Sequence, residues 1–476
     1  MNSAIKLTTL FTGCLLLISS CAVPSLVQKN KAIAVPAAFH ESNDTSNSAT
    51  INWRSYFTDP YLIALIDTAL KNNQEMNSLR QEVLISGTEI RARKGEYLPY
   101  LGVGGGGGFD KHGRYTNIGA MEANTEIAPG KEMPEPVTDM SIAFRAGWEL
   151  DIWKKLRNAK NAAVERYQGS VEAQHFFTTR LIAEIANAYY ELLALDNQLI
   201  NIRQNLDIQQ NALNIVKMEK NAAMATELAV RKFEAEVLKN QSQQYVILQQ
   251  IAVTENEINF LVGRLPQPIQ RNAQLFSELV PTLVHVGIPS QLLENRPDVR
   301  QAERELHAAK LDVKVSKANF YPAAKIVSGI GFQAFNPAYF IRSPESMLYS
   351  LGGEIIAPLI NRNAIKAQYF AANYKQVQAM YHYEQCIIKA YTEVLNQVSN
   401  ISNLDKYYDL KSKQVNALTE SIGISTSLFK SARADYMEVL MTQRDALEAR
   451  FELIEARKQQ MNAVVNIYQA LGGGWQ

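Results

Sequence analysis

The chain has 476 residues, of which 47% are hydrophobic and 20% charged, and this composition excludes disordered, collagen-like and small disulfide-rich proteins. It carries 48 basic and 47 acidic side chains, so its formal net charge of +1 provides no long-range positive field for binding nucleic acid. After the first twenty residues no apolar run reaches the length of a membrane-spanning helix, whereas short membrane strands are still allowed.

The beginning of the chain predicts an export signal. Residues 1–20 contain one early lysine and then a short apolar stretch, which is typical of a cleaved signal peptide. The run Leu17-Ile18-Ser19-Ser20-Cys21 is similar to a bacterial lipobox, which implies that Cys21 carries lipid and begins the mature chain. Ala22 and not aspartate follows Cys21, and by the same resemblance this implies that the protein is sorted to the outer membrane. The alternative is an ordinary signal cleaved near Ala22. Residues 21–50 lack a clear period and are interpreted as a tether.

The remainder of the chain follows one plan twice. Pro99 and Pro322 are 223 residues apart, whereas Gly263 and Gly472 are 209 apart, and such self-similarity indicates an internal duplication. The difference of 14 residues places a surplus in the first half, and we expect it in the polar loop 110–137. The predicted division is a first repeat at 51–263, a linker at 264–296 and a second repeat at 297–476.

Each repeat is predicted to contain two long helices. Starting at Ile185, nine of ten heptad positions are apolar, which indicates packed helices with a left-handed supercoil. The returning helix has the polar interruptions Asn240, Gln244 and Thr254, which we interpret as a side that faces water. The predicted helices cover residues 153–222 and 226–263 in the first repeat and residues 362–430 and 434–471 in the second.

Short segments with strand character precede the long helices. From Met140 to Leu150 apolar side chains alternate with mostly polar ones, which predicts a strand with one apolar face. Four strands cannot close a membrane barrel, since the smallest known barrels use eight, so several chains must pool their strands. The predicted strands are 98–109, 139–150, 323–335 and 347–357.

Signals for chemistry are weak. Residues 102–107 match the G-x-G-x-x-G template, but no helix begins at the last glycine, so we interpret the run as a barrel strand or turn. The six histidines are scattered without the spacing of metal ligands. We therefore predict no catalytic, cofactor-binding or metal site, and a protein that is not an enzyme.

Several motifs resemble successive signatures of the TolC-like outer-membrane efflux lipoproteins, the channel subunits of RND pumps. They cover essentially the whole mature chain and include Trp148-Glu149-Leu150-Asp151-Ile152-Trp153, Leu293-Glu294-Asn295-Arg296-Pro297-Asp298 and Tyr468-Gln469-Ala470-Leu471-Gly472-Gly473-Gly474-Trp475. The resemblance implies a mainly α fold with membrane β-strands, in which a strand hairpin and a long helical hairpin occur twice. It further implies a homotrimer whose twelve-stranded β-barrel continues into a periplasmic α-helical barrel.

The function implied by the resemblance is that of a passive conduit for drugs and other small toxic compounds. The implied partners are two further copies, a periplasmic adaptor, an inner-membrane RND pump and outer-membrane lipid. The alternatives are a TolC-like channel for type I protein secretion or heavy-metal efflux and, in a different class, a structural coiled-coil lipoprotein. The predicted strands speak against the structural lipoprotein.

The helix tips are the candidate contacts with the adaptor. Relatives commonly have glycine where this chain has Ala223 and Ala432, and an acidic ring where residues 421–432 contain no carboxylate. A stripe at i, i+3, i+4 and i+7 on the second long helix is the candidate gate, in which Ile424 and Leu428 form an apolar plug; the alternative is that the stripe packs against a neighbouring helix. The candidate tip residues are Ala222, Ala223, Thr226, Glu227, Ser431, Ala432, Asp435 and Tyr436, and the candidate gate residues are Ser421, Ile424, Ser425 and Leu428.

Overall fold

The structure is a computed structural model that describes residues 23–27, 36, 38–39, 46–279, 281, 284–431 and 433–475. The signal peptide, the lipidation candidate Cys21 and the tip residue Ala432 lie outside the described residues. The chain divides into two compact units, and each takes segments from both sequence repeats, so the units do not coincide with the repeats. No helix in the described part is long and apolar enough to cross a membrane.

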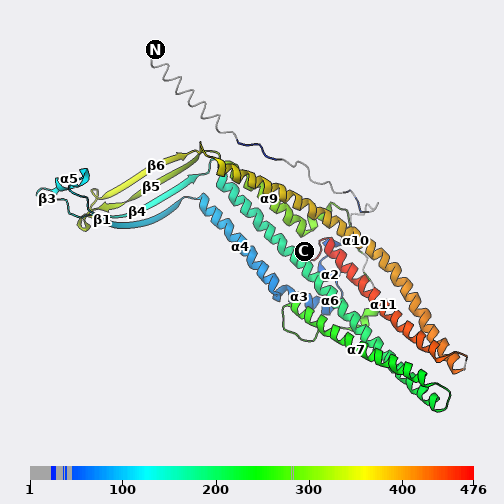
Figure 1. The fold of residues 1–476 in the computed structure, drawn as a ribbon. Coiled ribbons are helices and arrows are strands. Elements are labelled where there is room, and N and C mark those ends of the chain that lie inside the picture. Colours follow the sequence, from blue (N-terminus) through cyan, green and yellow to red (C-terminus); the bar gives the residue numbers. More distant parts are fainter. Residues whose placement is uncertain are drawn as a thin grey trace. The chain divides into compact units, whose positions relative to one another are not determined.

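The first unit contains a four-stranded antiparallel sheet with the order β1-β4-β5-β6 (Figure 1). Each strand begins and ends within two residues of its predicted range. The glycine run 102–107 lies inside the first strand, as one of its two interpretations expects. The strands are β1 (Tyr100–Asp110), β4 (Val137–Leu150), β5 (Ala323–Ala334) and β6 (Met347–Ile356).

The two connections in this sheet differ in length. Residues 111–136, 26 in all, join β1 to β4, whereas residues 335–346, only 12, join β5 to β6. The difference equals the surplus of 14 that the landmarks predict, and it lies in the expected loop. The longer connection contains helix α5 (Asn117–Ala123) and a small hairpin of β2 (Glu126–Ala128) and β3 (Lys131–Glu132), while the shorter contains the turn η3 (Pro337–Tyr339).

Two long helices, each followed by a shorter returning helix, dominate the helical part (Figure 1). With 67 residues, the first long helix is about 100 Å long at 1.5 Å per residue. The long helices are α6 (Lys155–Asn221) and α10 (Asn363–Lys430), and the returning helices are α7 (Glu227–Val262) and α11 (Tyr436–Ala470). The remaining elements are η1 (Ser48–Thr50), α2 (Trp53–Tyr56), α3 (Pro60–Asn72), α4 (Gln74–Tyr97), η2 (Ala273–Glu278), α8 (Gln291–Asn295) and α9 (Pro297–Ala318).

The heptad seam of α6 forms the centre of the second unit's core. Nine of its ten heptad residues are buried and Leu206 is half-buried, as the period predicts. The interpretation of the interruptions in α7 as a water-facing side is wrong for Asn240 and Thr254, which are both buried. Asn240 is tolerated there because its amide donates to the Gln209 side-chain oxygen of α6 at 2.7 Å. This polar pair belongs to the seam between the two helices.

The duplication is visible in the backbone at Gly263 and Gly472. Both follow a returning helix with a left-handed φ, 79° and 88° respectively. A Cβ at Gly263 would lie 2.6 Å from the carbonyl oxygen of Asn72, and one at Gly472 would lie 2.4 Å from that of Asn295. Only glycine fits at both positions, because the close backbone approach leaves no space for a Cβ and the left-handed conformation disfavours one.

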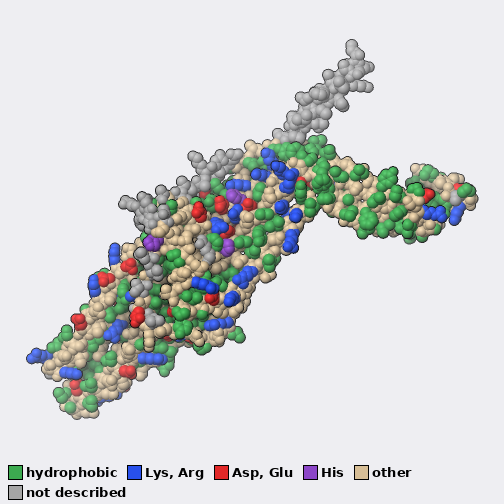
Figure 2. Space-filling view, turned by 180° about the vertical axis from the view of Figure 1, so that it is seen from behind, with side chains coloured by type: hydrophobic (Ala, Val, Ile, Leu, Met, Phe, Trp, Pro, Cys, Tyr) green, Lys and Arg blue, Asp and Glu red, His purple; other side chains and the backbone are tan. Residues whose placement is uncertain are grey.

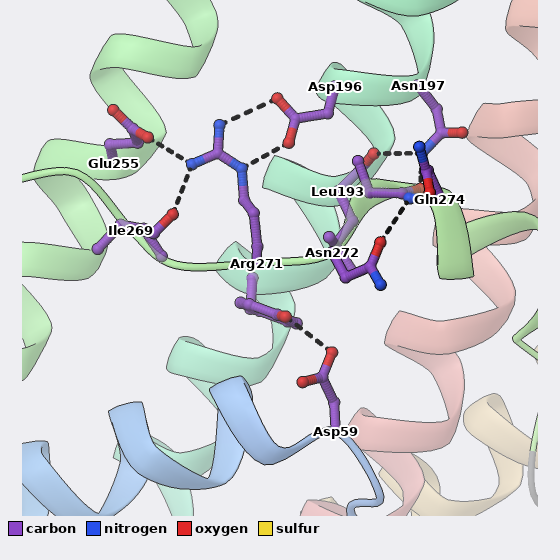
Figure 3. Close-up of polar contacts among 11 residues, drawn as sticks. Asp59, Leu193, Asp196, Asn197, Glu255, Ile269, Arg271, Asn272 and Gln274 are labelled. Atoms are coloured by element: carbon purple, nitrogen blue, oxygen red, sulfur yellow. Dashed lines mark hydrogen bonds and ion pairs between the residues drawn. The ribbon is translucent and has the colours of Figure 1, made fainter.

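The segment between the repeats is held against α6 and α7 by Arg271 (Figure 3). Its guanidinium donates to Asp196 at 2.5 and 3.0 Å and to the Ile269 carbonyl oxygen at 3.0 Å, and it pairs with Glu255. Burial lowers the pKa of Arg271, but the two carboxylates raise it by more, so the group stays charged. The predicted inter-repeat linker therefore lies against these two helices, and its Ile269 and Phe276 are buried in the core of the second unit.

Candidate functional site: the membrane sheet and the helix tips

The register gives the sheet two chemically distinct faces. On β4 the even-numbered residues 140–150 form an apolar face, and most of the apolar side chains of β1 and β6, though not Leu348 and Ile356, lie on the same side. These side chains are exposed in the single chain; Leu351, for example, is 81% exposed. Figure 2 shows the sheet at the right, where hydrophobic side chains cover much of the visible surface. An exposed apolar face of this kind suits contact with lipid.

The opposite face carries mainly small and polar side chains. It includes Ser141, Ala143 and Arg145 of β4, and in β1 the register places four glycines on it. A hollow of about 470 Å³ on the sheet is lined largely by residues of this face, including Arg145, Gln333 and Ser350. Polar residues towards a lumen and apolar residues towards lipid are the pattern of a barrel wall.

The sheet has two open edges in the described chain. Strands β1 and β6 occupy the outer positions, and each is paired on one side only. Unpaired edge groups cannot be satisfied in hydrocarbon, because lipid offers no hydrogen-bonding partners. The sheet therefore has to be completed by strands from elsewhere before it can lie in a membrane.

Aromatic side chains mark one end of the strands. The Trp148 indole donates to the Tyr97 carbonyl oxygen at 3.1 Å, and the Trp153 indole donates to that of Pro322 at 2.8 Å. Trp153 also stacks on Tyr321 with the ring centroids 4.6 Å apart. Rings that combine an apolar body with a satisfied N–H group are favoured at the interface between membrane and water.

The first tip is a tight turn between α6 and α7. The Met224 N–H donates to the Glu219 carbonyl at 2.8 Å and the Ala223 N–H to the Lys220 carbonyl at 2.9 Å, which is the hydrogen-bond pattern of a Schellman motif. This motif places Ala223 in the left-handed region with φ 59°. Its position is the one where the family resemblance expects glycine.

The other first-tip candidates begin helix α7. Thr226 caps the helix by accepting from the Ala229 N–H at 3.2 Å. Glu227 follows and pairs with Lys220 across the turn and with Arg231 at 2.8 Å. The Lys220 ammonium, and to a smaller extent the Arg231 guanidinium, hold the pKa of the Glu227 carboxyl below its usual range. The tip therefore presents charged side chains to solvent beside the exposed Ala222 and Ala223.

The second tip has the same hydrogen-bond pattern where it is described. The Arg433 N–H donates to the Leu428 carbonyl at 2.9 Å, as that of Met224 does to Glu219 in the first tip. Asp435 precedes α11 without a side-chain capping bond. Tyr436 is half-buried, with its ring 6.3 Å from that of Phe233 on α7. This candidate contact residue is therefore partly committed to packing between the two hairpins.

The structure separates the four gate candidates into two pairs. Ile424 is 61% and Leu428 38% exposed, so both are accessible in the single chain. Ser425 is buried, and its hydroxyl donates to the Ile422 carbonyl oxygen at 3.2 Å. Ser421 is half-buried, and its hydroxyl donates to the Ala417 carbonyl oxygen at 2.8 Å. Both serine hydroxyls bond to backbone carbonyls of their own helix, so of the four candidates only Ile424 and Leu428 are available for a plug.

Comparisons with known proteins agree with this arrangement. The family model described as outer membrane efflux protein matches residues 65–264 and 288–473. The chain is 25% identical over 473 residues to the pyoverdine export outer membrane protein OpmQ of Pseudomonas aeruginosa, covering 99% of this chain and 98% of that protein. It is 24% identical to the cation efflux system protein CusC of Escherichia coli, with 97% of each chain covered.

Solved structures give the same result for the fold. The open state of the MtrE outer membrane channel of Neisseria gonorrhoeae matches with a TM-score of 0.81 at 22% identity, over 96% of this chain and 98% of that chain. The predicted fold class, a duplicated strand hairpin and long helical hairpin of the kind that builds a trimeric β-barrel continuous with a helical barrel, is confirmed. The chain belongs to the outer membrane efflux protein family and is the outer-membrane channel of an efflux pump.

Proposed function

We propose that three copies of the chain pool their strands into one twelve-stranded barrel and form a passive conduit with their helices. The observation that carries this proposal is the sheet itself, which has a lipid-compatible face, a polar face and two open edges. Three identical four-stranded sheets joined β6 to β1 leave no edge exposed to hydrocarbon.

The conduit works with partners that supply energy and access. An inner-membrane RND pump drives transport, and a periplasmic adaptor contacts the tips at Ala222, Ala223, Thr226, Glu227, Ser431, Ala432, Asp435 and Tyr436. Lipid on Cys21 adds a second attachment to the outer membrane. Substrate enters at the tips, crosses the water-filled interior and leaves through the barrel.

The conduit has to be closed at rest, since an open tunnel would leak periplasmic contents. Ile424 and Leu428 from three chains form the closing plug, and a constriction of apolar side chains blocks ions by excluding water. Their exposure in the single chain supports this assignment. Opening is an outward movement of the hairpins, in which two arrangements of the helices lie close in free energy.

The cargo consists of drugs and other small toxic organic compounds. OpmQ is named for pyoverdine export, which supports small organic cargo, whereas CusC is named for cation efflux, which makes heavy-metal efflux the second candidate. Cells that lack the protein distinguish the two: we expect greater sensitivity to organic solvents and dyes, and an unchanged minimal inhibitory concentration of copper and silver salts.

The architecture is tested with purified protein. Native mass spectrometry in detergent is expected to show three copies, and planar lipid bilayers are expected to show discrete channels. A stable monomer inserted in lipid would contradict the proposal, because its sheet edges would lie unpaired in hydrocarbon.

A further inference from the structure

Arg145 stands at the middle of the polar face of the membrane sheet. In the register it lies opposite Gly102 of β1 on one side and Gly329 of β5 on the other, and Gly329 lies opposite Ser350 of β6. Arg145 is exposed, and among the residues that the structure describes none forms an ion pair or a side-chain hydrogen bond with it. Its level of the sheet therefore holds one cation and no compensating charge.

The neighbouring levels of this face are uncharged. Along β4 the nearest charges on the same face are Glu149 and Asp139, four and six residues away, which correspond to about 13 and 20 Å at 3.3 Å per residue. Both distances exceed the Debye length of about 8 Å at physiological salt. Lys325, near the end of the face, differs because it lies opposite Glu149 and Glu354 in the register.

An uncompensated guanidinium inside a membrane strand requires an explanation. Charged residues within spanning segments are costly in lipid, so they face an aqueous interior and mark pathways for ions or substrates. Gly102 leaves space on this face, because a Cβ built there meets no atom within 4 Å, whereas a Cβ at Gly329 would lie 3.2 Å from the Ser350 hydroxyl oxygen. The Arg145 side chain is therefore free to extend over the glycine surface into the interior.

We propose that Arg145 of three chains forms a ring of positive charge inside the barrel, which selects small organic anions as preferred cargo. Such cargo carries a carboxylate, sulfonate or phosphate. Rings of arginine or lysine favour anions in other pores, because field lines concentrate in an aqueous space that is enclosed by a low-dielectric wall. The inference rests on the proposed trimeric conduit and names the chemical class of its cargo.

The local potential is measured by the reactivity of a thiol introduced by Gly102→Cys, directly opposite Arg145. The trimer is treated with an anionic methanethiosulfonate that carries a sulfonate or with a cationic one that carries a trimethylammonium group. Labelling of the peptide that contains residue 102 is then quantified by mass spectrometry. With the thiol roughly 7 Å from the charge, Arg145→Gln is expected to lower the ratio of anionic to cationic rates about two- to sevenfold, depending on how far salt screens the charge. Arg145→Lys is expected to preserve the ratio.

Gly106→Cys is the matched control probe. Gly106 lies on the same face of β1, four residues from Gly102, and a Cβ there also meets no atom within 4 Å. Arg145→Gln should leave its ratio unchanged, because the charge is beyond the screening length. An unchanged ratio at Gly102→Cys, or an equal fall at both probes, would overturn the ring.

Two further measurements keep the inference separate from the conduit. Native mass spectrometry of each variant reports the trimer, so a failure to assemble counts against the architecture and not against the charge ring. With Arg145 intact, the ratio at Gly102→Cys should fall towards that of free cysteine as KCl rises from 0.05 to 1 M. A ratio that does not depend on salt would overturn the ring even if Arg145→Gln did not assemble.

Discussion

Ala223 shows how a single residue sets the shape of a helix tip. Its left-handed φ of 59° is imposed by the hydrogen bonds that close the turn, and a residue with a Cβ is disfavoured there by about 1–2 kcal/mol. The adjoining charges are exposed and contribute little stability. The tip is therefore held by backbone geometry at a cost in free energy that glycine would avoid.

Ala223→Gly is expected to stabilise the first tip. Glycine adopts the left-handed conformation without a clash, and after the greater flexibility of the unfolded chain is subtracted, the gain is about 0.5–1 kcal/mol. Hydrogen exchange of the tip amides should slow by a factor of two to five. Ala222→Gly is the matched control and should not slow exchange, since Ala222 is not among the described residues with positive φ. Unchanged or faster exchange in Ala223→Gly would contradict the strain.

The sequence identified Ala223 as unusual only through the family resemblance. Composition and periodicity contain no information about φ, so the strain itself becomes visible only in the structure. The same limit explains why Asn240 and Thr254 were wrongly interpreted as part of a water-facing side of α7. A polar residue in a heptad seam can be exposed or paired, and only the position of Gln209 on α6 decides between the two.

At the scale of elements, strands and helices were predicted closely because their periods of 2 and 3.5 residues are explicit in the sequence. It was harder to predict which of these elements contact one another. Strand β4 pairs with β5 from the other repeat, and Arg271 holds the segment between the repeats against two helices. Contacts over such distances depend on the tertiary arrangement, so no local pattern could predict them.

The pair Gln209 and Asn240 is expected to fix the register of α6 against α7. Asn240→Leu leaves the buried side-chain oxygen of Gln209 without its donor and should lower the free energy of unfolding by about 1–3 kcal/mol. The loss should appear as a lower midpoint when thermal denaturation is followed by the helical circular dichroism signal. The double variant Gln209→Leu with Asn240→Leu should recover most of this loss, since an apolar pair needs no hydrogen bond. Gln244→Leu, on the same helix but only half-buried, is the control. Equal midpoints for the single and double variants would show that the amide pair does not matter.

The gate is tested on the exposed face of α10. Replacing Ile424 and Leu428 by serine should raise single-channel conductance in planar bilayers and sensitise cells to large antibiotics, because a polar constriction stays hydrated. Leu410→Ser alters a leucine of the same helix whose exposed fraction, 65%, is close to that of Ile424, and it should leave conductance unchanged. If the double variant conducts like the wild type and remains trimeric, the two residues pack between helices and the constriction lies elsewhere.

At the scale of the whole molecule, we expect membrane attachment to have two independent sources. The strands provide one, and Cys21 is expected to provide the other through its acyl chains. Mass spectrometry of the mature protein should find lipid on Cys21, and Ser19→Ala should retain it. Cys21→Ser should lose the lipid yet still fractionate with the outer membrane, because the barrel itself is anchored. An unmodified mature chain that begins elsewhere would contradict the lipobox.

The open edges of the sheet also have a consequence for cells that make two versions of the chain. In the proposed trimer a closed ring needs three sound joints, and a single copy with a damaged β1 or β6 breaks one of them, which is enough to open the ring. Mixed assemblies would then fail even though most of their subunits are intact. Edge-strand mutations should therefore behave as dominant in genetic tests, whereas a deletion of the whole gene, which contributes no faulty subunit, should be recessive.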